Sequence, residues 1–298
     1  MRWLLFSLCV AAAGCQTTVA DPEKVAVVAT TSIIADAVRE VGGDRVAVQV
    51  LMGPGIDPHK YIPTAGDLSK LAGAKIVFFN GLHLEGKMTD VLEKSGQAVP
   101  VARGLAESEL HKFDDAHDPH IWFDPLLWSR CVDVIAEELA RLDPAHAGEY
   151  HERAESYAGR IRTEHAALEA LAASLPKARR ILVTSHDAFG YFGARYGFEV
   201  HGLQGVSTAT ETGLQDRQKL AAFLGKQRIP AVFGETSVPP KGLAAVLDSV
   251  KAEYGLAVKL VGGDDALYSD ALGPAGSPGA TYLGMLRHNM GVIVGALK

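Results

Sequence analysis

Hydrophobic and polar positions alternate between two kinds of segment in the first part of the chain. Short runs rich in β-branched residues predict buried strands, and the amphipathic stretches between them predict helices. The predicted strands are residues 25–29, 46–52 and 76–79, and the predicted helices are residues 32–43, 65–72 and 86–94. Ser32 is expected to cap the first of these helices. Strands that alternate with helices of this length indicate βαβ units and a parallel sheet.

The second part of the chain repeats this alternation. Its predicted strands are residues 180–184, 198–203, 231–234 and 256–261, and its predicted helices are residues 189–196, 214–226, 240–254 and 282–297. Two parts with one pattern predict an α/β protein that consists of two Rossmann-like βα lobes of similar size, at residues 25–143 and 177–298.

A long helical stretch separates the two lobes. A helix at 126–142 is followed by Asp143-Pro144, after which apolar residues recur at helical spacing until Pro176. They are Tyr150, Ala154, Tyr157, Ile161, Leu168, Leu171 and Leu175. A helix from 144 to 175 would be about 48 Å long, so residues 144–176 are predicted to form a backbone helix that links the lobes. Its histidines are not three or four residues apart, and we expect them to be solvated: His146, His151 and His165.

The first residues form a segment of another kind. A positively charged start precedes an apolar run at 3–13, which is typical of a secretory leader and too short to span a bilayer comfortably. Ala12-Ala13-Gly14-Cys15 resembles a bacterial lipoprotein box. The resemblance implies a signal peptide at 1–14, lipidation of Cys15 and a tether at 15–24. The alternative is plain secretion, with cleavage near Ala20.

Composition and charge exclude several classes of protein. The chain has 298 residues, of which 48% are hydrophobic and 21% charged, as in a globular domain. A net charge of −6 and the lack of any Lys/Arg cluster argue against a nucleic-acid partner. Cys9 and Cys15 belong to the leader, so Cys131 alone remains in the body of the chain. This excludes an internal disulfide and a thiolate zinc site, and Cys131 is expected to be a small buried hydrophobic residue.

The tripeptide Asp-Pro-His occurs twice, at 57–59 and at 118–120. Each proline fixes its own φ and restrains the residue before it, so each histidine lies on a stiff segment suited to a ligand. One such tripeptide could be a turn with a solvated histidine, but its repetition favours a common role for His59 and His120.

Candidate ligands follow the predicted strands in both parts of the chain. His59 follows a strand of the first lobe and His186 follows a strand of the second, and in open parallel sheets ligands bind beyond the carboxyl ends of strands. The loop at 262–280 adds three aspartates, among which spacing alone does not choose: Asp264, Asp265 and Asp270. Three imidazoles and one carboxylate would form a closed site for Zn²⁺, or for Mn²⁺ through a bidentate carboxylate, in the cleft between the lobes.

Together these segments resemble the TroA-like family, the metal-binding solute receptors of ABC importers for zinc and manganese. The matching segments are residues 57–59, 118–124, 185–192, 202–208, 235–237 and 267–271. The resemblance implies that His59, His120, His186 and Asp270 bind the ion, and that a long backbone helix joins two α/β lobes.

The resemblance also bears on the choice of metal. His186 stands where manganese-preferring relatives have glutamate, which favours zinc. Zinc-dedicated relatives usually have a long histidine-rich loop before the segment that matches residues 118–124, whereas this chain has only His111 and His117 there. We expect an exposed polar loop at these two residues.

These patterns predict a lipid-anchored extracytoplasmic receptor, not an enzyme. It would be a monomer that captures zinc and/or manganese and delivers the ion to an ABC importer permease with its ATPase. Glu235 is a candidate for orienting a ligand from behind. The alternative is a secreted zinc-dependent hydrolase with water as fourth ligand, although the chain has no His-Glu-x-x-His helix. A third possibility, an adhesin that uses the same fold as a surface patch, has no visible signal in the sequence.

Overall fold

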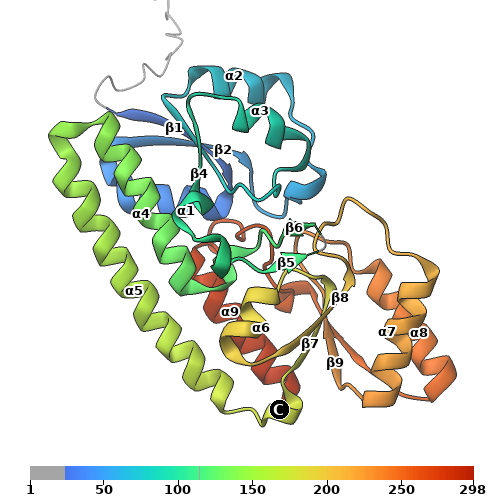
Figure 1. The fold of residues 1–298 in the computed structure, drawn as a ribbon. Helices are drawn as coiled ribbons and strands as arrows, with labels where there is room; N and C mark the ends of the chain where they lie inside the picture. The colour runs from blue at the N-terminus through green and yellow to red at the C-terminus, as the bar shows by residue number, and fades with distance from the viewer. Residues whose placement is uncertain (1–23, 114) are drawn as a thin grey trace, which may run out of the picture.

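The computed structural model describes residues 24–113 and 115–298, and two parallel four-stranded sheets form its framework (Figure 1). The first sheet has the order β2-β1-β3-β4, and the second has the order β10-β9-β7-β8. The strands of the first sheet are β1 (Val25–Thr31), β2 (Val46–Met52), β3 (Ile76–Phe79) and β4 (Ala98–Pro100). Those of the second are β7 (Ile181–His186), β8 (Glu199–Gln204), β9 (Ala231–Phe233) and β10 (Lys259–Val261).

Both sheets therefore have one topology, in which the second strand lies on one side of the first and the third and fourth lie on the other. All residues of β3 and of β9 are buried, as expected for parallel strands that are covered on both faces. The predicted α/β class with parallel sheets is confirmed. Because the chain changes direction beside β1 and beside β7, the carboxyl ends of these strands are natural binding positions.

Nine α-helices of the described residues surround the sheets. They are α1 (Ser32–Gly42), α2 (Ala65–Gly73), α3 (Thr89–Glu93), α4 (Pro125–Leu142), α5 (Ala147–Ala173), α6 (Gly190–Tyr196), α7 (Leu214–Gln227), α8 (Lys241–Tyr254) and α9 (Tyr282–Leu297). The sequence pattern missed three short strands: β4 and the antiparallel pair β5 (Lys112–Phe113) and β6 (Ala116–His117). β4 has only three residues and includes Pro100, which is tolerated at a sheet edge but weakens the strand signal.

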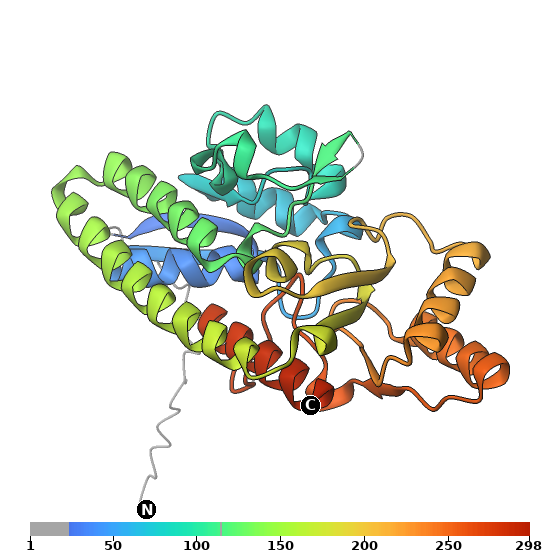
Figure 2. The ribbon, with the colours of Figure 1, turned by 60° about the horizontal axis from the view of Figure 1, so that its bottom comes forward.

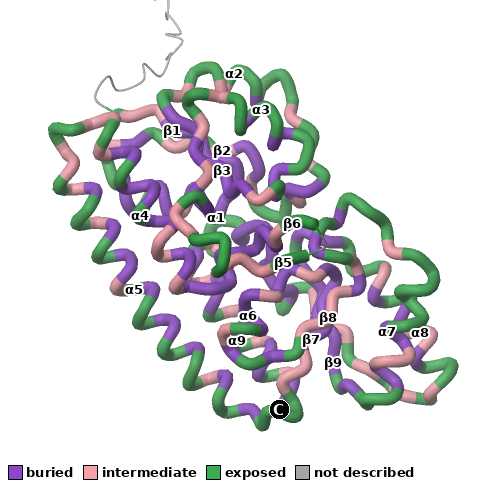
Figure 3. Tube along the Cα trace, in the orientation of Figure 1, coloured by how far each residue is buried: buried purple, intermediate pink, exposed green. Residues whose placement is uncertain are grey.

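The long helix α5 runs along the molecule beside both sheets (Figures 1 and 2). Its 27 residues span about 40 Å. One stripe is buried along its length, as the alternating colours of Figure 3 show, and this stripe packs on α1, α4 and α9. The Tyr157 hydroxyl donates to Asp36 of α1 (3.0 Å), and Arg287 of α9 pairs with Glu164. The division into lobes at 25–143 and 177–298 stays a prediction, since one apolar cluster includes helices from both parts.

Two local predictions were wrong. Helix α1 is capped by Thr31, whose hydroxyl accepts the N–H of Ile34, while the Ser32 hydroxyl accepts the N–H of Leu272. His165 is buried and its Nδ1 lies 3.1 Å from the Tyr196 hydroxyl, because four residues after Ile161 it shares the packed face of α5.

The described residues leave the predictions about the N-terminus open. The signal peptide at 1–14, Cys15 and the tether up to residue 23 lie outside them. None of the helices in the described ranges combines the length and the apolar character that crossing a bilayer requires. Cys131 lies in α4 and is fully buried, which raises the pKa of its thiol and confirms it as a buried hydrophobic residue.

Candidate metal centre

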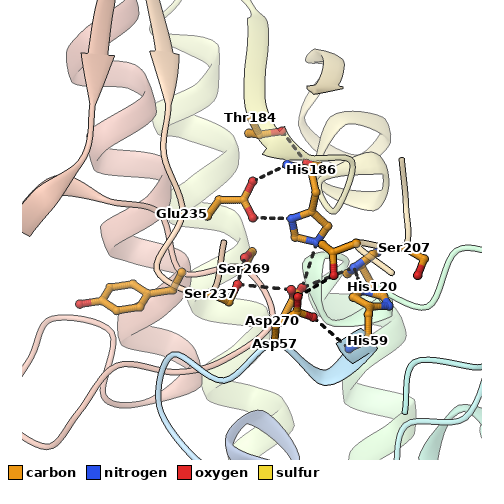
Figure 4. A network of polar contacts seen from close by, with 12 residues as sticks. Asp57, His59, His120, Thr184, His186, Ser207, Glu235, Ser237, Ser269 and Asp270 are labelled. Atoms are coloured by element: carbon orange, nitrogen blue, oxygen red, sulfur yellow. Dashed lines mark hydrogen bonds and ion pairs between the residues drawn. The ribbon is translucent and has the colours of Figure 1, made fainter. Parts of the chain in front are cut away.

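The four predicted ligands converge on one point between the two sheets (Figure 4). His59 lies on the short turn Pro58–Lys60 after β2, and His120 directly precedes the turn Ile121–Phe123 that leads to α4. His186 is the last residue of β7, and Asp270 lies in the loop after β10. One donor atom from each residue lies within 4.8 Å of the other three, and all four residues are buried.

Three of the six distances between donor atoms match those around a four-coordinate ion, and the other three are at most 4.8 Å. His59 Nε2 lies 3.3 Å from His120 Nε2, and Asp270 Oδ1 lies 3.4 Å from His120 Nε2 and 3.3 Å from His186 Nε2. A tetrahedron with bonds of about 2.0–2.1 Å has edges of roughly 3.3–3.4 Å. His186 Nε2 and Asp270 Oδ1 are buried without a hydrogen-bond partner among the described residues. Such unpartnered atoms are costly unless a cation satisfies them.

The repeated Asp-Pro-His motif has one structural explanation. Asp57 Oδ1 accepts the backbone N–H of His59, and Asp118 Oδ1 accepts that of His120, each at 3.0 Å. An aspartate that bonds to the backbone two residues later closes a local turn, and the proline between them restricts φ. The motif therefore fixes the backbone of each histidine before any ligand binds. The second carboxylate oxygen of Asp57 accepts from the Thr208 hydroxyl, across the gap to the second sheet, at 2.6 Å.

Two of the imidazoles are held from behind by carboxylates. Asp118 Oδ1 lies 2.7 Å from His120 Nδ1, and Glu235 Oε2 lies 2.5 Å from His186 Nδ1. Glu235 Oε1 also accepts the backbone N–H of His186 (2.8 Å). A carboxylate at Nδ1 keeps the ring proton there and leaves the lone pair of Nε2 free for an ion. The sequence pattern did not predict this contact of Asp118, although the place of Asp118 in the repeated motif could have indicated it.

An aromatic side chain from the segment 118–124 joins the two segments that hold His120 and Asp270. Trp122 Nε1 donates to the Ser269 carbonyl (3.0 Å), and the Tyr282 hydroxyl donates to the Trp122 carbonyl (2.8 Å). The loop with Asp270 is thereby fixed beside the segment with His120, so residues 150 positions apart in sequence share one rigid site.

The charges of the site favour a cation. Burial lowers the pKa of His59 to about 3, with help from the other two imidazoles, so its ring is neutral. Burial opposes the charged form of His120 as well, but Asp118 and Asp270 raise its pKa to about 9. Asp270 and Glu235 raise the pKa of His186 in the same way. Buried carboxylates thus favour a positive charge at the point where the Nε2 atoms converge.

The other candidates lie elsewhere. Asp264 and Asp265 are exposed in the turn Gly263–Asp265, so of the three aspartates in this loop only Asp270 joins the cluster. The expected exposed loop at His111 and His117 is instead a hairpin. The ring of His111 stacks on Tyr191 with centroids 4.0 Å apart, and His117 lies in β6.

Comparison with known proteins places this geometry in a family. The family model described as ZnuA, the periplasmic component A of a zinc-uptake complex, matches residues 27–296. The zinc-binding protein TroA of Treponema pallidum is 46% identical over 275 residues, which cover 91% of this chain and 88% of TroA. The manganese-binding lipoprotein MntA of Bacillus subtilis is 43% identical over 293 residues, 96% of this chain and 94% of MntA.

A solved structure shows the same fold. The periplasmic zinc-binding protein TroA of T. pallidum superposes with a TM-score of 0.88 at 45% identity, covering 92% of this chain and 99% of TroA. These relatives are named as metal-binding proteins, which supports the transport interpretation over the hydrolase alternative. The match over nearly the whole described chain shows that the protein belongs to the ZnuA family and is a TroA-like metal-binding protein.

Proposed function

We propose that the protein captures a divalent transition metal, zinc and/or manganese, outside the cytoplasm and delivers it to an ABC importer. His59, His120, His186 and Asp270 are the proposed ligands. The observation that supports this most directly is the convergence of three Nε2 atoms and Asp270 Oδ1, at distances suited to one four-coordinate ion.

The geometry favours binding over catalysis. A catalytic zinc site keeps one coordination position open for water or substrate, whereas a site with four protein ligands is closed. Asp270 Oδ1 lies within 3.4 Å of two imidazole nitrogens and would occupy the position that a hydrolase leaves free. The ion is therefore cargo, and the protein releases it unchanged. Glu235 and Asp118 orient His186 and His120 for this task.

The proposed location is the outer side of the cytoplasmic membrane, with Cys15 as the lipidated anchor. The lipoprotein box at residues 12–15 and the name of the B. subtilis relative, a lipoprotein, support this location. The partners are then the metal ion, a permease and its ATPase, and the protein acts as a monomer. Nucleic acid is not among them, because the chain has a net charge of −6.

Equilibrium dialysis of the chain from residue 15, with zinc and with manganese, tests the proposal. We expect one ion per chain at about pH 7.5 and weaker binding at about pH 5, because an imidazole must be neutral to ligate. Unchanged binding at the lower pH would contradict histidine ligation. A parallel screen with ester, peptide and phosphate substrates decides against the hydrolase alternative if the zinc-loaded protein turns over none of them.

A further inference from the structure

Two buried hydroxyls lie behind Asp270, on the side away from the imidazoles (Figure 4). Ser237 follows β9 on the same segment as Glu235, and Ser269 directly precedes Asp270. The Ser237 and Ser269 hydroxyl oxygens are 2.8 Å apart, and Ser237 Oγ lies 3.3 Å from Asp270 Oδ2. Neither serine contacts the donor atoms of the three histidines in these bonds, so their effect reaches the site through Asp270 alone.

The number of protons fixes the direction of these hydrogen bonds. A hydroxyl has one proton to donate, and an ionised carboxylate can only accept. Both contacts are satisfied only when Ser269 donates to Ser237 and Ser237 donates to Asp270 Oδ2. Consecutive bonds of this kind polarise and strengthen one another.

The two oxygens of Asp270 are therefore unequal. Oδ1 faces His120 and His186 and has no hydrogen-bond partner in the described part of the chain, whereas Oδ2 is held by Ser237. An ion bound where the imidazoles converge therefore has one free oxygen of Asp270, Oδ1, and one restrained oxygen, Oδ2, beside it. Rotation of the carboxylate toward a bidentate position would break the bond from Ser237.

We infer that Ser237 is a specificity-determining residue, which keeps Asp270 monodentate and thereby favours zinc over manganese. The inference rests on the proposed function and goes one step beyond it. Zinc is satisfied by four ligands with nitrogen donors, whereas manganese prefers oxygen donors and a larger number of them. The second oxygen of Asp270 is an oxygen donor on a residue that already faces the ion, and the Ser237 hydroxyl withholds it.

Replacement of Ser237 by alanine tests the inference. In Ser237→Ala the second oxygen is free to bind, so manganese should bind more tightly and the ratio of zinc to manganese affinity should fall by about tenfold, the worth of one hydrogen bond to a charged group. Competition dialysis with both ions measures the ratio. Co²⁺ gives a second readout, because the intense visible absorption of four-coordinate Co²⁺ should weaken when a fifth ligand binds. Ser237→Thr keeps the hydroxyl and should restore both signals.

Ser269→Ala is the matched control, since it removes a buried hydroxyl beside Asp270 but leaves Ser237 to donate to Oδ2. The ratio of zinc to manganese affinity in Ser269→Ala should stay closer to the wild-type ratio than it does in Ser237→Ala. X-ray absorption of the zinc-loaded wild-type protein needs no variant and should show four nitrogen or oxygen ligands. Five ligands there, or a Ser237→Ala protein with the wild-type ratio and Co²⁺ spectrum, would overturn the inference. A wild-type protein that binds neither ion would overturn the proposed function itself.

Discussion

The two sheets share one topology, yet the segments after their third strands use a buried carboxylate differently. Glu235 follows β9 and accepts two N–H groups of His186, at the end of β7. Glu85 follows β3, and its Oε1 accepts from the Thr30 hydroxyl of β1 (2.8 Å) and from the backbone N–H of Asn80 (2.6 Å). Glu235 therefore accepts a hydrogen bond from an imidazole, whereas Glu85 accepts hydrogen bonds only from neutral groups.

Glu235 therefore acts on a proposed ligand, whereas Glu85 holds a loop in place. Burial raises the pKa of Glu85 to about 7, and its Oε2 has no partner in the described part of the chain. Asn80, which Glu85 holds, donates through Nδ2 to the Pro119 carbonyl (3.0 Å), directly before His120. Glu85 thus supports the segment before His120 through neutral hydrogen bonds, whereas Glu235 contacts the ring of His186 itself.

The largest expected effect comes from removing a ligand on either side. His120→Ala and His186→Ala should each raise the zinc Kd by more than about a hundredfold, because even the residues behind a ligand are worth ten- to a hundredfold. Isothermal titration calorimetry measures the Kd, and His201→Ala, which removes a histidine that bonds Glu199 outside the site, is the control. A loss on one side only would mean that the two halves do not share the ion.

The second prediction concerns the pH dependence of stability. Burial raises the pKa of Glu85 in the folded protein to about 7, from an ordinary value of about 4.5. Between these values the folded protein keeps a proton that the unfolded chain releases, so the free energy of unfolding should fall by about 3 kcal/mol as the pH rises. Glu85→Gln should lack this fall, because glutamine resembles the neutral acid. Urea unfolding of the metal-free protein at several pH values measures the difference.

The exposed Glu93 of α3 offers the control for this measurement. Glu93→Gln should leave the slope of stability against pH as in wild type, whereas Glu85→Gln should flatten it between pH 4.5 and about 7. Parallel curves for wild type and Glu85→Gln would show that Glu85 is ionised in the folded protein over this whole range, and the proposed contrast between the two glutamates would be lost.

Glu235→Gln, unlike Glu85→Gln, should act mainly on zinc affinity. It removes the charge at His186 Nδ1, so the zinc Kd should rise about ten- to a hundredfold. Glu85→Gln, which touches no ligand side chain, should change the Kd by no more than about threefold. Calorimetry on both variants tests this pair directly. Equal losses of affinity would mean that the two carboxylates act alike, through the fold.

Much of this contrast was predictable from the sequence. The alternation of apolar runs and helical patterns predicted seven of the eight strands of the two sheets, because buried parallel strands are continuous apolar runs. The repeated Asp-Pro-His motif indicated His59 and His120, whose backbone turns are local. Asp270 needed the family resemblance, because spacing did not distinguish it from Asp264 and Asp265.

What sequence did not predict depends on contacts between distant residues. The bond of Ser237 to Asp270 joins two separate loops of the second sheet, and no local pattern indicates it. The burial of His165 follows from the packing of α5 on α6, where Tyr196 lies, and not from the spacing of the histidines in α5. Propensity and periodicity describe single elements, whereas these side chains are defined by the element opposite them.

The smallest expected effect concerns the bond between the two sides of the site. Thr208 is fully buried in the loop after β8, and its hydroxyl donates to Asp57 Oδ2 (2.6 Å). Thr208→Val keeps the shape and removes this bond, but Asp57 Oδ1 still holds the backbone of His59. The zinc Kd should therefore rise only about two- to fivefold, through faster dissociation.

Stopped-flow transfer of zinc from the protein to a chelator measures the rate of dissociation. Thr212→Val, in the same loop, loses only a bond to the neutral Leu203 carbonyl, outside the metal centre, and should release zinc at the wild-type rate. If the Thr212 variant accelerated release as much as the Thr208 variant, the loop as a whole, rather than its bond to Asp57, would set the rate.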